Sequence, residues 1–192
     1  MAVDRERIER TVREVLSERE VSEEVSEAPA GRGPRRPGPS ASVALASDHG
    51  CFALKEALRR YLTEELGLVV RDLGPATDAP CDYPDFAALV ARSVARGECE
   101  RGIVIDGAGI GSAMAANKVA GVRAACCHDV RTVVNSRSHN NANVLTLGAA
   151  VVGRGLARQM VRVWLSTPFE GGRHERRVAK IMELEREWTG KS

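Results

Sequence analysis

Residues 102–112 read Gly-Ile-Val-Ile-Asp-Gly-Ala-Gly-Ile-Gly-Ser, an apolar run that ends in an aspartate and a loop with three glycines. A short apolar run of this kind predicts a strand that is buried on both faces. The glycines predict a tight turn into a helix that begins near Ser112. Strand, glycine loop and helix in this order form the unit from which open α/β sheets are built, so this segment is the centre of the predicted fold.

Four further apolar runs predict strands, and helical patterns separate them. These runs are Val43–Ala46, Leu68–Val70, Arg123–Cys127 and Asn143–Leu147. Strands that alternate with helices imply right-handed crossovers and parallel pairing. The sequence therefore predicts an α/β, Rossmann-like three-layer αβα sandwich with a doubly wound, mostly parallel five-stranded sheet. Two late helices, over residues 153–165 and 176–188, have aliphatic faces suited to packing on the sheet or on a second subunit.

The chain before this domain has a different composition. Residues 1–25 are charged, and Ile8, Val12, Val15 and Leu16 recur at the spacing of one helix face, which predicts a short amphipathic helix. Residues 26–42 are rich in proline and glycine and cannot bury enough apolar area to offset their ordering entropy, which predicts a disordered linker. The globular domain is expected over residues 43–192.

Length and composition limit the functional classes. A chain of 192 residues with 43% apolar content and a net charge of +2 can bury one α/β core. No basic stripe indicates nucleic acid, no run reaches the roughly 20 apolar residues of a membrane span, and the charged start lacks a secretory signal. We therefore expect a cytoplasmic protein with neither nucleic acid nor membrane as partner.

The five cysteines are odd in number and lack the spacing of zinc ligands. We expect reduced thiols, with Cys126 and Cys127 in a buried strand.

The glycine loop is the first candidate site. Glycines before a helix leave backbone amides free to bind an anion or a developing oxyanion. The spacing is not a dinucleotide fingerprint, because Ser112 stands where the third glycine of that motif belongs. Two alternatives remain open: a nucleotide site in which Asp129 binds the ribose, and a purely structural turn.

Two histidines and a cluster of arginines are further candidates. Asp48 and His49 follow the first predicted strand, and His139 precedes the last one. Arg173 and Arg177 are four residues apart and would share a helix face, where both guanidinium groups could bind one phosphate. Alternatively, the arginines form a solvated basic face and the histidines serve structure.

The order of these motifs along the chain is more specific than any one of them alone. Asp48-His49, residues 107–118, residues 139–145 and residues 170–178 occur in one order that closely resembles the ribose-5-phosphate isomerase B and galactose-6-phosphate isomerase family. The similarity covers about residues 43–185. The resemblance implies an isomerase that needs no metal or other cofactor and moves a proton between C1 and C2 of a sugar phosphate through a cis-enediol.

The resemblance also implies roles for single residues. His139 matches the histidine that assists opening of the furanose ring, and Arg173 and Arg177 match the phosphate-binding arginines, aided by His49. Other matches line the sugar site or form the anion hole for the enediolate: Asp48, Tyr83, Asn140, Gly107, Ala108, Gly109 and Gly111. Family sites lie between two subunits, which implies a homodimer or a dimer of dimers. Ribose 5-phosphate and ribulose 5-phosphate are the expected pair, and a six-carbon sugar phosphate is the alternative.

The sequence departs from the family at the expected base. Many members have a catalytic cysteine where this chain has Asp106, and others have a glutamate at the position of Ser112. Ala108 replaces a frequent Thr or Ser. We predict that Asp106 is the general base, with His139 as the second catalytic residue. Loop amides would lower the pKa of Asp106 and burial would raise it, and the sequence leaves the balance open.

Two alternatives to this catalytic assignment follow. Asp106 could serve only to hydrogen-bond the loop amides, and the whole protein could bind sugar phosphates without turnover.

The N-terminal segment resembles the encapsulation peptides of enzymes in bacterial microcompartments. An amphipathic helix of this length gains stability by binding in a groove on a partner. The expected partner of residues 1–25 is therefore a microcompartment shell protein, which would place the enzyme in the compartment lumen. A self-association helix and an inert extension are the alternatives. Five glutamates within residues 6–20 argue against a mitochondrial transit peptide.

Overall fold

The computed structural model describes residues 42–190. The amphipathic helix expected over residues 1–25 lies outside the described residues, as does the expected linker except for its last residue. That residue, Ser42, is the first residue of strand β1.

Five parallel strands form one sheet, in the order β2-β1-β3-β5-β4. Their bounds are Ser42–Ser47 for β1, Val69–Asp72 for β2, Arg101–Asp106 for β3, Ala124–Cys126 for β4 and Val144–Gly148 for β5. The central strand β3 pairs on one side with β1, Ser47 opposite Ile105, and on the other with β5, Asp106 opposite Gly148. The predicted Rossmann-like parallel sheet is confirmed, with each strand within two residues of its expected bounds.

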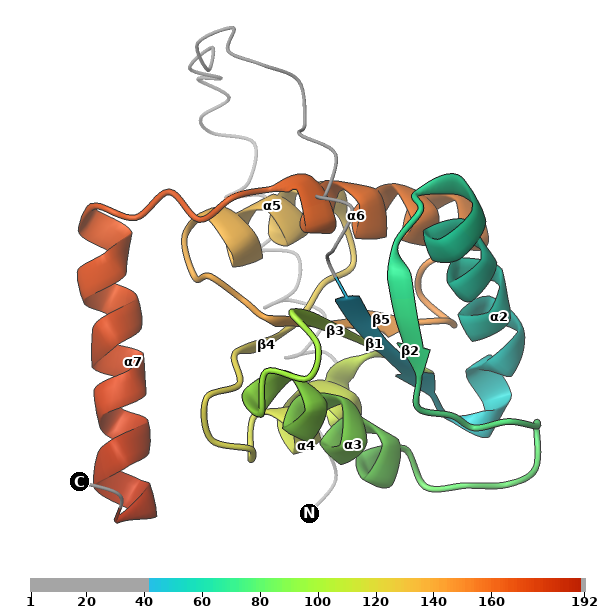
Figure 1. Ribbon diagram of the computed structural model, residues 1–192, viewed down its shortest axis with the longest axis horizontal. Helices are drawn as coiled ribbons and strands as arrows, with labels where there is room; N and C mark the ends of the chain where they lie inside the picture. Colours follow the sequence, from blue (N-terminus) through green and yellow to red (C-terminus); the bar gives the residue numbers. More distant parts are fainter. Residues whose placement is uncertain (1–41, 191–192) are drawn as a thin grey trace, which may run out of the picture. The chain divides into compact units, whose positions relative to one another are not determined.

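Helices cover both faces of the sheet (Figure 1). One face packs against α2 (Phe52–Arg60, which continues as a π-helical turn over Tyr61–Glu65), α5 (Val130–Ser138) and α6 (Arg154–Ser166), and the other against α3 (Tyr83–Ala95) and α4 (Ile110–Ala116). Alternation along β1 explains the two layers. Val43 and Leu45 face the first set of helices, whereas Ala44 and Ala46 face α3.

Two helices begin earlier than expected, each directly after a glycine in a left-handed or unusual conformation. Helix α4 begins at Ile110 rather than near Ser112, because Gly109 at φ 80° allows the chain to turn directly into the helix. Helix α7 spans Arg173–Thr189 and follows Gly172 at φ 54°. Arg173 therefore lies in the first turn of α7, one turn before Arg177.

The expectation of a buried strand around Cys126 and Cys127 is wrong for Cys126. Strand β4 lies at the edge of the sheet, and its three residues are only half-buried. Cys127, just after the strand, is buried. The Asn117 side chain occupies the open edge: it accepts a hydrogen bond from the amide of Ala124 at 2.8 Å and donates to its carbonyl at 2.9 Å. All five cysteines are free thiols.

Helix α7 lies apart from both helical layers in Figure 1 and leaves an apolar face open. Ile181, Leu184 and Trp188 are 46%, 57% and 87% exposed. The main attachment is polar: both carboxylate oxygens of Glu185 accept the amide of Gly121, at 3.0 and 2.9 Å. Across residues 42–190, no helix combines the length and the apolar character needed to cross a bilayer.

Candidate active site

The carboxyl ends of β1 and β3 carry the first group of polar residues. These two strands are neighbours. The chain continues from β1 to β2 on one side, and from β3 through α4 to β4 on the other. Such a switch in strand order opens a crevice at the carboxyl edge of the sheet. We call the residues around it the carboxyl-edge cluster. Its members are Asp48, His49, Tyr83 and residues 106–111.

Hydrogen bonds to the backbone hold Asp48 and His49 in this cluster. The amide of Asp48 donates to the carbonyl of Ile105 at 3.0 Å, which ties the loop after β1 to the end of β3. The Asp48 carboxylate accepts the amide of Cys51 at 2.9 Å and so caps a short 3₁₀ turn. His49 is exposed, and its Nδ1 lies 3.2 Å from the backbone nitrogen of Cys81.

Asp106 is buried at the end of β3 and binds the amides of the loop that follows it. Its Oδ1 accepts from the amides of Ala108, at 2.8 Å, and Gly109, and its Oδ2 accepts from the amide of Ser112 at 2.9 Å. Burial alone would raise the pKa of this carboxyl, but hydrogen bonds from Ser112 and the loop amides outweigh burial and lower the pKa below its ordinary value. The balance that the sequence left open is thus decided by the amides.

Tyr83 and Gly111 are in direct contact. Tyr83 begins α3, and a Cβ atom on Gly111 would lie 2.5 Å from Cζ and 2.6 Å from Oη of the tyrosine. Only glycine leaves room for this ring against the first turn of α4. Tyr83 therefore lies against the glycine loop, and this residue is 40% exposed.

A second group lies where α5 ends and α7 begins, and we call it the amino-edge cluster. Its members are His139, Asn140, Glu170, Arg173, His174 and Arg177. The amide of Glu170 donates to the carbonyl of Ser138 at 3.0 Å, which brings the two segments together. The rings of His139 and His174 stack with centroids 4.0 Å apart and an interplanar angle of 6°. Glu170 Oε2 lies 3.6 Å from Nε2 of His139 and 3.8 Å from Nε2 of His174.

The charges of this cluster are largely positive. Arg173 and Arg177 are exposed on successive turns of α7, and Nε of Arg173 lies 3.3 Å from Nε2 of His174. His174 itself is buried. Burial lowers the pKa of His174, and the neighbouring His139, Arg173 and Arg177 lower it further. His174 is therefore neutral at pH 7, and the exposed guanidinium groups remain available for an anion.

The two clusters lie at opposite edges of the sheet within one chain. Helix α5 starts after the carboxyl end of β4 and runs back, so His139 at its end lies beside the amino edge from which β5 begins. Asp106 ends the six-residue strand β3 at the other edge. Six residues of strand span about 20 Å, at roughly 3.3 Å per residue. One chain thus gathers two separate halves of the predicted site.

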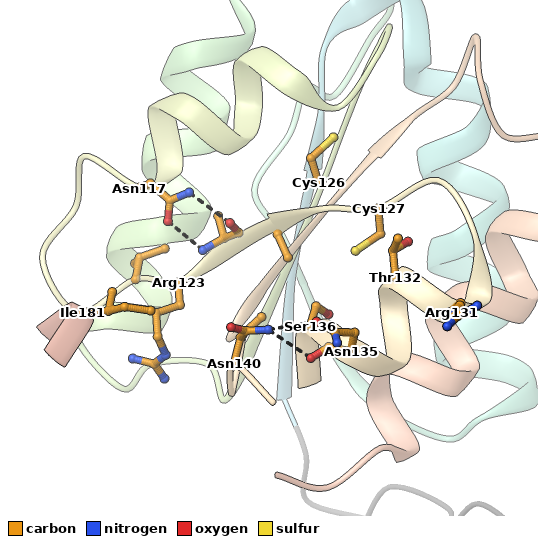
Figure 2. A pocket seen from close by; sticks show the side chains of 14 residues that line it. Asn117, Arg123, Cys126, Cys127, Arg131, Thr132, Asn135, Ser136, Asn140 and Ile181 are labelled. Atoms are coloured by element: carbon orange, nitrogen blue, oxygen red, sulfur yellow. Dashed lines mark hydrogen bonds between the residues drawn. The ribbon is translucent and has the colours of Figure 1, made fainter. Parts of the chain in front are cut away.

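The structure also shows residues to which the sequence reading gave no role. Glu170 and His174 contact His139, and their spacing of four residues within the Glu-Gly-Gly-Arg-His motif was a usable signal. Asp129, the alternative ribose ligand, instead caps α5 by accepting the amide of Thr132 at 2.7 Å. A cavity of about 580 Å³ lies along the open edge of β4, and Asn135, Asn140, Arg123 and Arg131 are among its lining residues (Figure 2).

Comparison with known proteins matches residues 43–181 to the family described as Ribose/Galactose Isomerase. Ribose-5-phosphate isomerase B of Escherichia coli is 43% identical over 74% of this chain and 95% of its own length. D-erythrulose-4-phosphate isomerase of Pectobacterium atrosepticum is 41% identical over 73% of this chain and 92% of its own. The crystal structure of Mycoplasma genitalium ribose-5-phosphate isomerase B with bound ribulose-5-phosphate superposes with a TM-score of 0.74, at 43% identity over 77% of this chain and 98% of that one.

Proposed function

Because this chain belongs to the Ribose/Galactose Isomerase family, we propose that it is a sugar-phosphate isomerase that interconverts ribose 5-phosphate and ribulose 5-phosphate. The observation that carries the proposal is the presence of both halves of such a site. A carboxylate and a glycine loop occupy the carboxyl edge, and two exposed arginines stand beside a histidine at the amino edge.

The working unit is a homodimer. The two clusters are separated by the sheet within one chain, so a site that contains both requires the carboxyl edge of one copy to face the amino edge of another. A twofold axis would then create two equivalent sites. The apolar face of α7, with Ile181, Leu184 and Trp188, is the surface that a second copy would cover, since leaving these side chains in water is unfavourable.

The reaction divides between the two clusters. Arg173 and Arg177 bind the phosphate, with His49 of the other copy, and His139 assists opening of the furanose ring. Asp106 then removes the proton from C2 of the aldose as a carbon–carbon double bond forms between C1 and C2, and O1 gains a proton. The cis-enediol gives up its O2 proton as Asp106 returns a proton to C1, which produces the ketose. No step needs a metal or a redox cofactor.

Asp106 has one geometric feature in favour of this role and one against it. Oδ2 accepts one backbone amide, from Ser112, whereas Oδ1 accepts two, so Oδ2 is the oxygen with fewer backbone donors and the better placed to accept a substrate proton. However, the lowered pKa of Asp106 makes it a weaker base than the thiolate of a family cysteine. The expected consequence is slow turnover, which a cysteine at this position would accelerate.

The test measures isomerisation of ribose 5-phosphate in D₂O by wild type, Asp106→Asn and Asp106→Cys. We expect wild type to incorporate deuterium at the transferred position, the Asn variant to isomerise at least about 100-fold more slowly, and the Cys variant to isomerise faster than wild type. Undiminished exchange in the Asn variant would assign the base to another residue. A complete lack of isomerisation by wild type would reject the isomerase itself.

A second candidate function is binding of sugar phosphates without turnover. It requires that the loop amides stay bonded to Asp106 when the ligand binds. The specific observation in its favour is that Asp106 already occupies the amides of Ala108, Gly109 and Ser112, which would otherwise stabilise an enediolate. Calorimetric binding of ribose 5-phosphate, lost in Arg173→Ala and unaccompanied by proton exchange at C2, would identify this function.

For residues 1–25 the proposed partner remains a microcompartment shell protein. The support is the amphipathic pattern of the sequence, with Ile8, Val12, Val15 and Leu16 on one helix face. Residues 1–41 fused to a fluorescent protein should form puncta when shell proteins are co-expressed, and replacement of Val12 and Leu16 by Asp should abolish them. Diffuse fluorescence of the unmodified fusion would contradict encapsulation.

A further inference from the structure

Asn135 contacts the ring-opening histidine and is given no role by the family motifs. It lies on α5 one turn before His139, and its Nδ2 lies 2.9 Å from Nδ1 of the histidine. Its backbone carbonyl also accepts the amide of His139 at 3.0 Å. The Asn135 side chain lines the cavity beside β4 together with Asn140. Figure 2 shows the Asn140 side chain directed at Asn135. Side chain and backbone of Asn135 therefore both bind the residue whose proton matters for ring opening.

The orientation of the Asn135 and Asn140 side-chain amides follows from their contact with a backbone carbonyl, which can only accept a hydrogen bond. The backbone oxygen of Asn135 can only accept, and the Asn140 side chain approaches it at 3.2 Å, so that atom of Asn140 must be its NH₂ group. The same NH₂ group lies 3.1 Å from the Asn135 side chain, which must therefore present its oxygen. The other arm of Asn135, which faces His139, is then its NH₂ group.

This chain of assignments places the proton of the neutral imidazole. Because Asn135 donates to Nδ1, that nitrogen must accept, and His139 carries its proton on Nε2. The Nε2–H group faces the carboxylate of Glu170, 3.6 Å away, a favourable arrangement of opposite partial charges.

The neighbouring ring is fixed in the opposite sense. Arg173 donates from Nε to Nε2 of His174, so neutral His174 carries its proton on Nδ1. His139, Glu170 and His174 place one potential ligand atom each within 4.8 Å of one another, a spacing that a divalent metal could bridge. However, metal ligation needs a free lone pair on each nitrogen. Nε2 of His139 bears a proton and Nε2 of His174 already accepts from Arg173, so this arrangement suits proton placement rather than a metal.

We propose that Asn135 is a positioning residue that holds His139 in the Nε2–H tautomer. His139 then meets the ring oxygen of the sugar as a hydrogen-bond donor through Nε2, with Nδ1 held by the helix. Asn140 supports this role by fixing the orientation of Asn135. The inference rests on the proposed isomerase function for its catalytic consequence, whereas the tautomer itself depends only on the contacts of the described residues.

The test is nitrogen NMR of the full-length protein labelled with ¹⁵N in its histidines, at about pH 8.5, where an ordinary imidazole is neutral. The chain has four histidines, so the His139→Gln variant identifies the signals of His139. Wild type should show the Nε2–H tautomer. In Asn135→Asp a carboxylate accepts from Nδ1–H and should reverse the tautomer, and Asn135→Leu should give a mixture. Val134→Thr, an exposed change on the same helix and outside the cavity, should leave the spectrum as in wild type.

Kinetics complete the test. The kcat for ribose 5-phosphate should fall by about tenfold or more in Asn135→Asp, with KM within about twofold, and should not change in Val134→Thr. An Nδ1–H tautomer in wild type, or a reversed tautomer with unchanged kcat, would overturn the proposal. If Asn135→Asp does not fold, the spectrum of Asn135→Leu decides, and an unmixed Nε2–H tautomer in that variant would contradict the proposal. Absence of turnover in wild type would reject the proposed function and the kinetic role of Asn135. The nitrogen NMR spectrum would still test the tautomer of His139 independently.

Discussion

The carboxylate of Asp106 accepts a hydrogen bond from the backbone amide of Ser112, 2.9 Å away and six residues later in the chain. Together with the bonds from Ala108 and Gly109, this contact closes the glycine loop around a charge that belongs to the protein itself. The amides of Ala108, Gly109 and Ser112 are therefore engaged before any substrate binds. The proposed catalytic base and the hydrogen-bond acceptor of the loop are the same carboxylate.

Asp106→Asn should destabilise the fold by about 1–3 kcal/mol at pH 7, because the amide NH₂ group would face N–H donors that need an acceptor. The lowered pKa of Asp106 adds a pH dependence. A carboxylate of this kind contributes stability that is complete above its unfolded pKa, about 3.9, and is lost as pH falls through its folded value. Urea unfolding at fixed protein concentration should show the two proteins converging below about pH 4. Equal stability at pH 7 would mean that the loop does not need this acceptor.

Gly111→Ala should impair the site without unfolding the domain. The new methyl group would overlap the ring of Tyr83, 2.5 Å from Cζ, and displace it from the crevice. We expect kcat/KM for ribose 5-phosphate to fall by about 10- to 100-fold. Gly155→Ala on α6 is the matched control, because nothing lies within 4 Å of its added Cβ. Full activity of Gly111→Ala would remove Tyr83 from the substrate site.

Mixing two inactive variants should restore activity if the site is shared between subunits. Arg173→Ala leaves the carboxyl-edge cluster intact, and Asp106→Asn leaves the amino-edge cluster intact. In a refolded equimolar mixture about half of the dimers pair the two variants, and each has one complete site, which gives about a quarter of wild-type activity. Steady-state assays before and after mixing measure this recovery. A mixture no more active than its components would contradict an active site built from both subunits.

His174 should make the fold sensitive to mild acid. Burial and neighbouring positive charges lower the pKa of His174 from its ordinary 6.5, so the folded state resists a proton that the unfolded chain accepts. Stability is then complete above about pH 6.5 and decreases as pH falls through that value towards the folded pKa. His174→Gln should flatten this part of the profile in thermal unfolding between pH 8 and pH 5. An unchanged slope would assign the acid sensitivity to other groups.

His139 should matter for sugars that form a ring and not for those that cannot. Ribose 5-phosphate closes a furanose ring through its C4 oxygen, whereas in erythrose 4-phosphate that oxygen carries the phosphate. A relative that acts on erythrulose 4-phosphate makes the tetrose a reasonable substrate to test. We expect His139→Gln to lower kcat on ribose 5-phosphate by about 100-fold and to spare any activity on the tetrose. Equal losses on both sugars would indicate a role other than ring opening.

The fold was predictable because its signals are local. Each strand is a short apolar run between turn residues, such as Gly102–Ile105 before the glycine loop, and these runs keep their identity in any arrangement of the sheet. The position of β4 was less accessible. An edge strand and a central strand can have the same pattern of apolar residues, and only the strand order reveals that Cys126 is half-buried.

The sequence by itself determined the parallel sheet, the loop after β3 and the family to which the chain is similar, since all of these depend on residue order. Only the tertiary structure decided what Asp106 binds and where the two clusters lie. Three amides converge on one carboxylate because the backbone turns at Gly109, and no spacing of letters encodes that geometry. Helix α5 returns the chain to the amino edge before His139, so the histidine and Asp106 lie on opposite edges of one sheet.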